Sequence, residues 1–268
     1  MGGTVITFSN FKGGTGKTTN STMTGIELAR REYKTLLIDL DPQANATNLY
    51  LKTKNNVGGE FTSFDETLMT AIKNKNLKPA IINVLPNLDI LPSSADFSLY
   101  PRYMENLISN YTERVKYLST LISTWKDDYD YLLVDVPPTI SLITDTALYM
   151  TDYAIVVLQT QERSLQGAQA FIKYMQDQII NEFQAPTLDL LGILPVLLKN
   201  GAPVDKSTLD KAIELFGKEN IFDITIKNME RLKRYDVTGV TFKDQFDKAV
   251  QDVYSGVTDE IFYRMAGE

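Results

Sequence analysis

Residues 4–19 read TVITFSNFKGGTGKTT, and this stretch decides the fold. Every residue of Thr4–Phe8 is β-branched or aromatic, which predicts a buried strand. The chain then becomes rich in glycine, reaches Gly-Lys-Thr, and continues from Thr18 to Arg31 with residues that favour a helix. Such a strand, loop and helix form a cradle for phosphate groups, because backbone amides and the positive end of the helix point at one anion.

Each residue of the loop has an expected contact with a bound nucleoside triphosphate. We expect Lys17 to reach the β- and γ-phosphates, the Thr18 hydroxyl to ligate Mg²⁺, and Thr19 to lie on the α-phosphate side. The remaining contacts would come from the backbone of the residues Gly13, Gly14, Thr15 and Gly16. A simple glycine turn would explain the glycines alone, but it would not explain the whole succession of strand, loop, Gly-Lys-Thr and helix. The sequence therefore predicts that ATP and Mg²⁺ bind here.

The composition excludes several other kinds of chemistry. The chain has 268 residues, of which 43% are apolar and 23% charged, as in ordinary globular proteins. It contains no cysteine and no histidine, which excludes disulfides, Cys/His metal sites, a cysteine nucleophile and a histidine base. The net charge is 27 − 34 = −7, so any contact with nucleic acid or anionic lipid must come from a local basic patch. Without an apolar run of about 18 residues or a signal peptide, the expected location is the cytoplasm.

Short β-rich runs alternate with longer helical stretches along the whole chain. The expected strands are Thr4–Phe8, Thr35–Asp39, Leu88–Pro92, Tyr131–Asp135, Tyr153–Leu158 and one within Leu188–Leu198. The expected helices are Thr18–Arg31, Tyr100–Trp125, Ser164–Phe183 and Phe242–Met265, and Asn55–Gly59 is expected to be a surface loop. This order predicts an α/β fold of the P-loop NTPase kind, doubly wound, with a mostly parallel sheet and helices on both faces. We expect one domain over residues 1–268, with no helix-turn-helix domain before the first strand.

Carboxylates follow two of these strands. Asp39 ends one strand with Asp41 just beyond it, and Asp135 ends another. The carboxyl ends of parallel strands lie beside a bound phosphate. Because histidine is absent, an aspartate is the natural residue to orient the attacking water. Asp135 and Asp41 are also candidates to hold Mg²⁺. An ordinary turn at the end of a strand is the alternative explanation for each aspartate.

The phosphate loop departs from the general pattern at one place. Phe11 stands where that pattern has glycine, and Lys12 follows it. A second lysine could point outward, to the phosphates of a nucleotide in another subunit. The segment Lys12–Thr18 resembles the deviant Walker A motif of the ParA/MinD ATPase family. The resemblance implies that Lys12 is the signature lysine acting across an ATP-sandwich homodimer, and that Lys17 is the P-loop lysine.

The resemblance extends over most of the chain. Leu37–Thr47 resembles the family's switch I, whose second aspartate orients the attacking water, and on this resemblance we assign that catalytic role to Asp41. Pro137–Thr144 resembles switch II, although Thr146 replaces the usual asparagine and Asp145 precedes it. Phe222–Asn228 resembles the late loop beside the base, which implies that Asn228 contacts the nucleotide.

The family contains proteins that act on DNA and proteins that act on membranes. The C-terminal helix has more acidic than basic residues, so we expect it to pack on the protein and not to bind a membrane. The candidate DNA contacts are the basic residues Lys227, Arg231, Lys233 and Arg234, which Lys206 and Lys211 could extend. A solvated charged turn is the alternative explanation for this group.

The resemblance therefore implies an ATPase for plasmid or chromosome partition. Such an ATPase binds DNA nonspecifically and associates with the nucleoid when ATP is bound, and a ParB-like centromere-binding protein stimulates its hydrolysis. The alternatives are a MinD-like membrane-positioning ATPase, a small-molecule ligase on a related loop, and a regulator that binds nucleotide but scarcely hydrolyses it.

Overall fold

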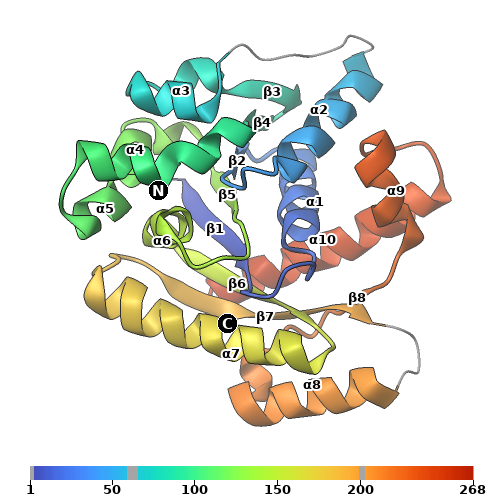
Figure 1. Cartoon of the computed structure of the whole chain (residues 1–268). Helices are drawn as coiled ribbons and strands as arrows, with labels where there is room; N and C mark the ends of the chain where they lie inside the picture. The colour runs from blue at the N-terminus through green and yellow to red at the C-terminus, as the bar shows by residue number, and fades with distance from the viewer. Residues whose placement is uncertain (1–2, 59–65, 199–202, 268) are drawn as a thin grey trace.

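A largely parallel sheet lies at the centre of the molecule (Figure 1). The structure, a computed structural model, describes residues 3–58, 66–198 and 203–267. Within these ranges eight strands form one sheet in the order β3-β4-β2-β5-β1-β6-β7-β8, in which β3 pairs antiparallel with β4. The strands are β1 (Thr4–Ser9), β2 (Thr35–Asp39), β3 (Ile82–Leu85), β4 (Leu88–Leu91), β5 (Tyr131–Asp135), β6 (Tyr153–Gln159), β7 (Asp189–Leu198) and β8 (Ile226–Lys227).

Helices cover both faces of the sheet. The α-helices are α1 (Lys17–Arg30), α2 (Asn45–Gly58), α3 (Leu68–Lys73), α4 (Tyr100–Leu107), α5 (Tyr111–Ser123), α6 (Leu142–Tyr149), α7 (Glu162–Tyr174), α8 (Pro203–Phe216), α9 (Glu230–Thr238) and α10 (Gln245–Met265). Short 3₁₀-helices are η1 (Lys78–Ala80), η2 (Ala95–Leu99), η3 (Lys126–Asp128) and η5 (Lys218–Asn220), and the π-helical segment η4 (Met175–Glu182) continues α7.

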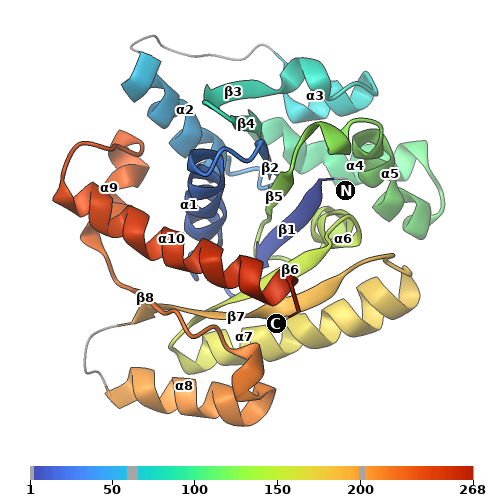
Figure 2. The ribbon, with the colours of Figure 1, turned by 180° about the vertical axis from the view of Figure 1, so that it is seen from behind.

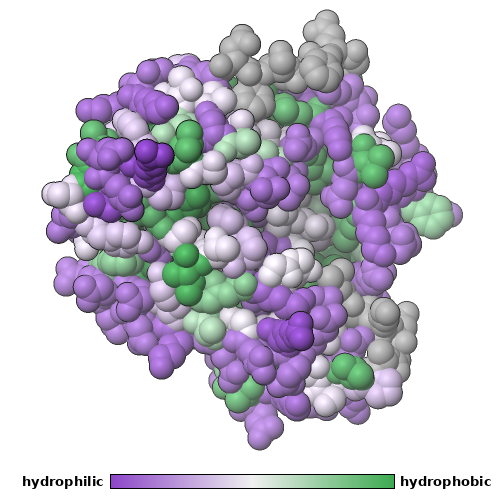
Figure 3. Space-filling view, in the orientation of Figure 1, coloured by the Kyte–Doolittle hydropathy of each residue, from purple (hydrophilic) through white to green (hydrophobic). Residues whose placement is uncertain are grey.

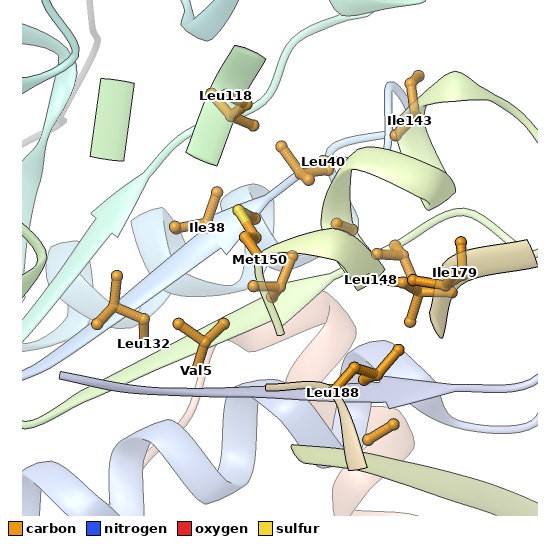
Figure 4. Packing of buried hydrophobic residues seen from close by; sticks show 14 of the residues in the cluster. Val5, Ile38, Leu40, Leu118, Leu132, Ile143, Leu148, Met150, Ile179 and Leu188 are labelled. Carbon is orange, nitrogen blue, oxygen red and sulfur yellow. The ribbon is translucent and has the colours of Figure 1, made fainter. Parts of the chain in front are cut away.

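The alternation of side chains along the strands divides the core into two layers. Val5 points into the layer under α3–α8, and its neighbour Ile6 points into the layer under α1, α2, α9 and α10. Figure 4 shows the first layer, where Val5 and Leu132 of neighbouring strands lie on the same side of the sheet as Leu118 of α5. Both faces of the sheet are thus buried, which confirms the predicted doubly wound α/β fold.

Several predicted boundaries were wrong, and local chemistry explains them. The predicted helix Tyr100–Trp125 is two helices, because Asn110 caps α5 by accepting a hydrogen bond from the Glu113 amide. The C-terminal helix begins at Gln245 and not at Phe242, because Asp244 and Asp247 form a capping box. Residues 55–58, predicted as a surface loop, form the last turn of α2, and Gly59 lies outside the described residues.

The sequence prediction missed most of the amphipathic and short elements. These are α2, α3, α6, α8, α9 and the edge strand β3. Polar residues interrupt the apolar spacing of α2 and α9, so their helical period is weak, while α3 and α6 are too short to show one clearly. Of the segment Phe222–Asn228, only Ile226–Lys227 is strand.

The C-terminal helix packs along the helix that follows the phosphate loop. Figure 2 shows α10 lying across α1. Arg31 at the end of α1 pairs with Asp259 of α10 at 2.6 Å, and the Tyr254 hydroxyl donates to Asn20 at 3.2 Å. Apolar residues of α10 such as Val257 are fully buried, which is consistent with the expectation that this helix packs on the protein. Among the described residues, none of the helices has the length and apolar character needed to cross a bilayer.

Candidate functional site

The phosphate loop joins β1 to α1 at the carboxyl end of the sheet (Figure 1). Gly14 and Gly16 have φ angles of 72° and 91°, in the left-handed region that other residues seldom adopt. Gly16 is the N-cap of α1, and no side chain caps the helix there. The first amides of α1 therefore keep their hydrogen-bonding capacity for an anion.

Two lysines of the loop point in different directions. Lys17 is 6% exposed, and its ammonium donates to the Lys12 backbone oxygen at 3.3 Å. Burial lowers the pKa of Lys17, whereas the nearby carboxylates of Asp135 and Asp41 oppose this shift. The half-buried Lys12 side chain instead donates from Nζ to Gln159 Oε1 at 2.8 Å, at the end of β6. Within one subunit, therefore, a side chain of the neighbouring strand holds the Lys12 ammonium.

Asp39 and Asp135 lie opposite one another, because they are paired in register at the ends of β2 and β5. Both side chains are fully buried. Asp135 accepts hydrogen bonds from Thr18 Oγ1 at 2.8 Å and Ser21 Oγ at 3.4 Å, and Asp39 accepts two from Thr47. Burial raises the pKa of Asp135, and the charge of Asp39 raises it further.

This arrangement fits a divalent cation. The Thr18 hydroxyl and the Asp135 carboxylate are oxygen donors of the kind that Mg²⁺ prefers, and they already lie in contact. Lys17 brings positive charge close to the buried Asp135, but the carboxylate of Asp39, also buried, lies opposite Asp135, so one ammonium faces two buried carboxylates. A cation at Thr18 and Asp135 would offset the remaining negative charge.

Asp41 lies just past the end of β2, as predicted, and is partly exposed. Its amide donates to Asp39 Oδ1 at 3.0 Å, and its carboxylate accepts from the Gln43 amide at 2.9 Å. These bonds fix the turn. They use only part of the hydrogen-bonding capacity of the Asp41 carboxylate. Asp41 is also near enough to Lys17 to affect its pKa, so the structure brings it to the phosphate loop.

The sequence analysis missed the residues that seat the loop on α7. Asn10 is buried, donates to the Val157 oxygen at 2.9 Å and accepts from the Lys12 amide at 2.9 Å. Gly167 of α7 lies directly against the Asn10 side chain, since a Cβ on Gly167 would stand 2.5 Å from Asn10 Oδ1. A polar residue placed directly after an apolar strand, like Asn10, was the available signal in the sequence.

A small pocket of about 90 Å³ opens beside the phosphate loop. One wall is formed by the loop and the start of α1, and the other by the ends of the sheet, α9 and α10. The lining residues are Thr15, Gly16, Thr19, Asn20, Val196, Ile226, Asn228, Met229, Leu232, Lys233, Asp236 and Tyr254. The structure thus places Asn228 next to the loop, where a nucleotide base could lie. Lys233 and Asp236, which the sequence analysis did not assign to this pocket, face it as well.

The basic residues proposed for DNA separate into two groups. Arg231 is largely buried: its guanidinium pairs with Asp244 and, at 3.5 Å, with Asp247, and it lies over the Phe246 ring. We therefore correct its assignment from DNA contact to structural ion pair. Lys227, Lys233 and Arg234 are exposed, although Lys233 also pairs with Glu230 at 2.7 Å.

The suggested extension of this basic group was wrong. Lys206 and Lys211 lie on α8, which Figure 1 shows well separated from α9, and Lys211 pairs with Glu162 of α7. Figure 3 shows a mainly hydrophilic surface over α9, with single hydrophobic residues between the polar ones.

Comparison with known proteins agrees with this arrangement. An AAA domain family matches residues 3–188. A virulence plasmid ParA family protein of Chlamydia psittaci is 34% identical over 195 residues, covering 70% of this chain and 67% of that protein. Chromosome partitioning protein ParA of Myxococcus xanthus is 28% identical over 231 residues, covering 86% and 77%. The fold resembles that of Cyanothece McdA in complex with ATP, with a TM-score of 0.80 and 18% identity over 97% of this chain and 96% of that one. The chain belongs to the ParA-type family of P-loop partition ATPases.

Proposed function

We propose that this protein is a partition ATPase that works as an ATP-dependent homodimer on plasmid or chromosomal DNA. The observation that carries the proposal is the position of Lys12, whose ammonium is bound by Gln159, whereas the Lys17 ammonium donates to a backbone oxygen of the phosphate loop itself. A half-buried ammonium on a single amide oxygen can exchange this contact for the stronger one with a phosphate. In a dimer that phosphate would belong to the nucleotide of the partner subunit.

The other site residues suit hydrolysis of the bound ATP. The cradle from Gly13 to Thr19, with Lys17, would hold the triphosphate, and Asn228 would contact the base. Thr18 and Asp135, with Asp41 nearby, would hold Mg²⁺, which supplies charge neutralisation at the β- and γ-phosphates. Asp41 would orient a water molecule for attack on the γ-phosphorus. The bond from the γ-phosphorus to the bridging oxygen then breaks, and ADP and phosphate leave.

DNA binding in this proposal depends on the exposed residues Lys227, Lys233 and Arg234. Three cations on one subunit would give weak, salt-sensitive phosphate contacts, and dimerisation would double their number. A ParB-like protein bound to the centromere would stimulate hydrolysis. The dimer would then separate into single subunits, which do not hold DNA. In the cell the ATP-bound form would then be found on the nucleoid.

The dimer is tested by light scattering after size exclusion, with Mg²⁺ and ATP, ADP or no nucleotide. We expect a dimer with ATP only, and a monomer for Lys12→Ala under all three conditions. Gln159→Ala is the matched variant, since it removes the contact of Lys12 within its own subunit and should keep the ATP-dependent dimer. A Lys12→Ala protein that still dimerises with ATP would contradict the proposed role of this lysine.

DNA and membrane are compared under the same nucleotide conditions. Fluorescence anisotropy with a random 40-base-pair duplex should show binding with ATP at moderate salt and little binding with ADP. Vesicles containing anionic lipid serve as the alternative ligand. Binding to vesicles but not to DNA would support a membrane-positioning ATPase, and binding to neither would leave a ligase or a nucleotide-binding regulator.

A further inference from the structure

A buried carboxylate lies outside the nucleotide site. Asp145, in the first turn of α6, is 2% exposed and accepts hydrogen bonds from the Tyr111 and Tyr174 hydroxyls, each at 2.5 Å. Tyr111 comes from the start of α5 and Tyr174 from the end of α7. We refer to these three side chains as the Tyr111–Asp145–Tyr174 cluster. Burial raises the pKa of Asp145, while the two tyrosine hydrogen bonds lower it again.

The stability of α6 alone does not account for this cluster. An acidic residue in the first turn of a helix is favourable even on the surface, where it needs no partner. Here the carboxylate is desolvated, which is unfavourable unless hydrogen bonds replace water. Tyrosines from two other helices supply those bonds, so the cluster fixes α5, α6 and α7 relative to one another.

The cluster touches the phosphate loop through one of its tyrosines. The Tyr174 ring packs edge-on against Phe11, with centroids 5.5 Å apart, and Phe171, one turn earlier on α7, also packs edge-on against Phe11 at 5.4 Å. Phe11 is the residue that replaces the usual glycine of the loop, and it directly precedes Lys12. Directly after Tyr174, the helix changes from α to π geometry over Met175–Glu182. Stretches of π-helix are rare and often lie at functional sites.

The same cluster reaches the segment that follows Asp135. Residues 136–141 connect Asp135 to α6, and the Thr144 hydroxyl in the first turn of α6 donates to the Thr139 oxygen in this connection at 2.5 Å. Asp145 is the next residue along the helix. A shift of α6 would therefore move residues 136–141 and change the hydrogen bond to the Tyr174 hydroxyl. Through the packing of Tyr174 on Phe11, it would also displace the loop that carries Lys12.

We propose that Asp145 is a positioning residue for the phosphate loop, which acts through Tyr174 and Phe11 to fix the backbone at Lys12. Tyr111 connects the same carboxylate to the protein surface, because Tyr111 is 42% exposed. Its ring also packs on Phe183 at the end of η4. The contribution of Lys12 to dimerisation rests on the proposed function. The positioning of the loop does not rest on it, because the contacts from Asp145 through Tyr174 to Phe11 all lie within one subunit.

Hydrogen exchange tests the positioning in the absence of nucleotide. The Lys12 amide is protected by Asn10 Oδ1, so the exchange of residues 10–13 reports on how firmly the loop is seated. Tyr174→Phe keeps the ring against Phe11 but loses the bond to Asp145. We expect this variant to exchange these amides about three to ten times faster, the effect of losing one hydrogen bond. Asp145→Asn should act in the same direction.

The control is Tyr117→Phe on α5, because the Tyr117 hydroxyl is buried without a hydrogen-bond partner among the described residues. It should leave the exchange of residues 10–13 as in the wild-type protein. The proposal is overturned if Tyr174→Phe leaves these amides unchanged, even when the amides of α5 and α6 exchange faster. That result would mean that the cluster only joins the helices. Tyr174→Phe decides the question alone if Asp145→Asn does not fold.

A second measurement separates this proposal from the proposed function. In Tyr174→Phe, we expect the affinity for fluorescent ATP to stay within about twofold, and the dimer formed with ATP to be about three to ten times weaker. If the wild-type protein forms no dimer with ATP, the proposed function fails, while the exchange experiment still decides the positioning. Weaker ATP binding with an unchanged dimer would contradict the proposal, because the cluster meets the loop at Phe11, next to Lys12 and outside the cradle residues Gly13–Thr19.

Discussion

Replacement of Arg231 by alanine distinguishes between the two roles considered for this residue, a DNA contact and a structural ion pair. In the structure, Arg231 neutralises Asp247, whose side chain is 1% exposed, and also pairs with the more exposed Asp244. Removing one partner of a buried ion pair costs about 3–5 kcal/mol. Asp247 keeps hydrogen bonds from Tyr235, Thr241 and the Lys243 amide, which reduces the loss to about 2–3 kcal/mol.

The contact of the guanidinium with an aromatic ring adds to this figure. Arg231 lies 5.4 Å from the centre of the Phe246 ring, and such a contact contributes about 0.5–1 kcal/mol. The expected loss for Arg231→Ala is then about 3 kcal/mol, which corresponds to a fall in the melting temperature of roughly 6–12 °C for a chain of this size. Thermal unfolding followed by circular dichroism measures it.

The comparison variant is Arg234→Ala on the same helix. The described residues provide no ion-pair partner for the exposed Arg234 guanidinium, so its loss should change stability by less than about 0.5 kcal/mol. DNA affinity with ATP should fall in this variant, and the slope of its salt dependence should decrease by about 1 per subunit. If Arg231→Ala melts like the wild type and loses DNA affinity instead, the structural assignment of Arg231 is refuted.

Three further substitutions address the nucleotide site. Asp41→Ala should bind ATP within about threefold of wild type but release phosphate at least about 100-fold more slowly, as expected for loss of a group that orients water; unchanged turnover would exclude Asp41 from this role. Thr18→Ala should require about tenfold more Mg²⁺ for half-maximal turnover, and an unchanged Mg²⁺ requirement would exclude Thr18 as a ligand. Gly167→Ala places a Cβ 2.5 Å from Asn10 Oδ1 and should destabilise the protein by about 1–3 kcal/mol in thermal unfolding. Gly58→Ala, where a Cβ meets nothing within 4 Å among the described residues, is its control, and equal melting of the two variants would show that Gly167 is not a close contact.

The fold and the phosphate loop were largely predictable because they depend on local patterns. Strands buried on both faces are continuous apolar runs, so β1, β2, β5 and β6 were recognised within a residue or two. Their parallel arrangement then brings Asp39, Asp41 and Asp135 to one edge without further information. The edge strand β3 was missed because only part of it is buried, which leaves its apolar pattern weak.

The partners of individual side chains could not be predicted in the same way. The charge balance near α9 depends on Asp244 and Asp247, which the sequence analysis did not connect with Arg231 because a loop separates them from the helix. Likewise, Gln159 lies far from Lys12 in the sequence, and only the pairing of β1 with β6 brings the two together. Contacts of this kind follow from the packing of whole elements and have no signature in the local sequence.

The pocket beside the phosphate loop has a consequence for the synthesis of the protein. Its first wall, Thr15–Asn20, leaves the ribosome well before its second wall, with Asn228 and Tyr254, because the two walls lie far apart along the chain. A nascent chain that has not yet released α9 and α10 has the phosphate loop but lacks the second wall of the pocket, and it also lacks the Tyr254 hydroxyl that donates to Asn20. Under the proposed function, a nucleotide in this pocket can therefore help to stabilise the fold only after both walls have been synthesised.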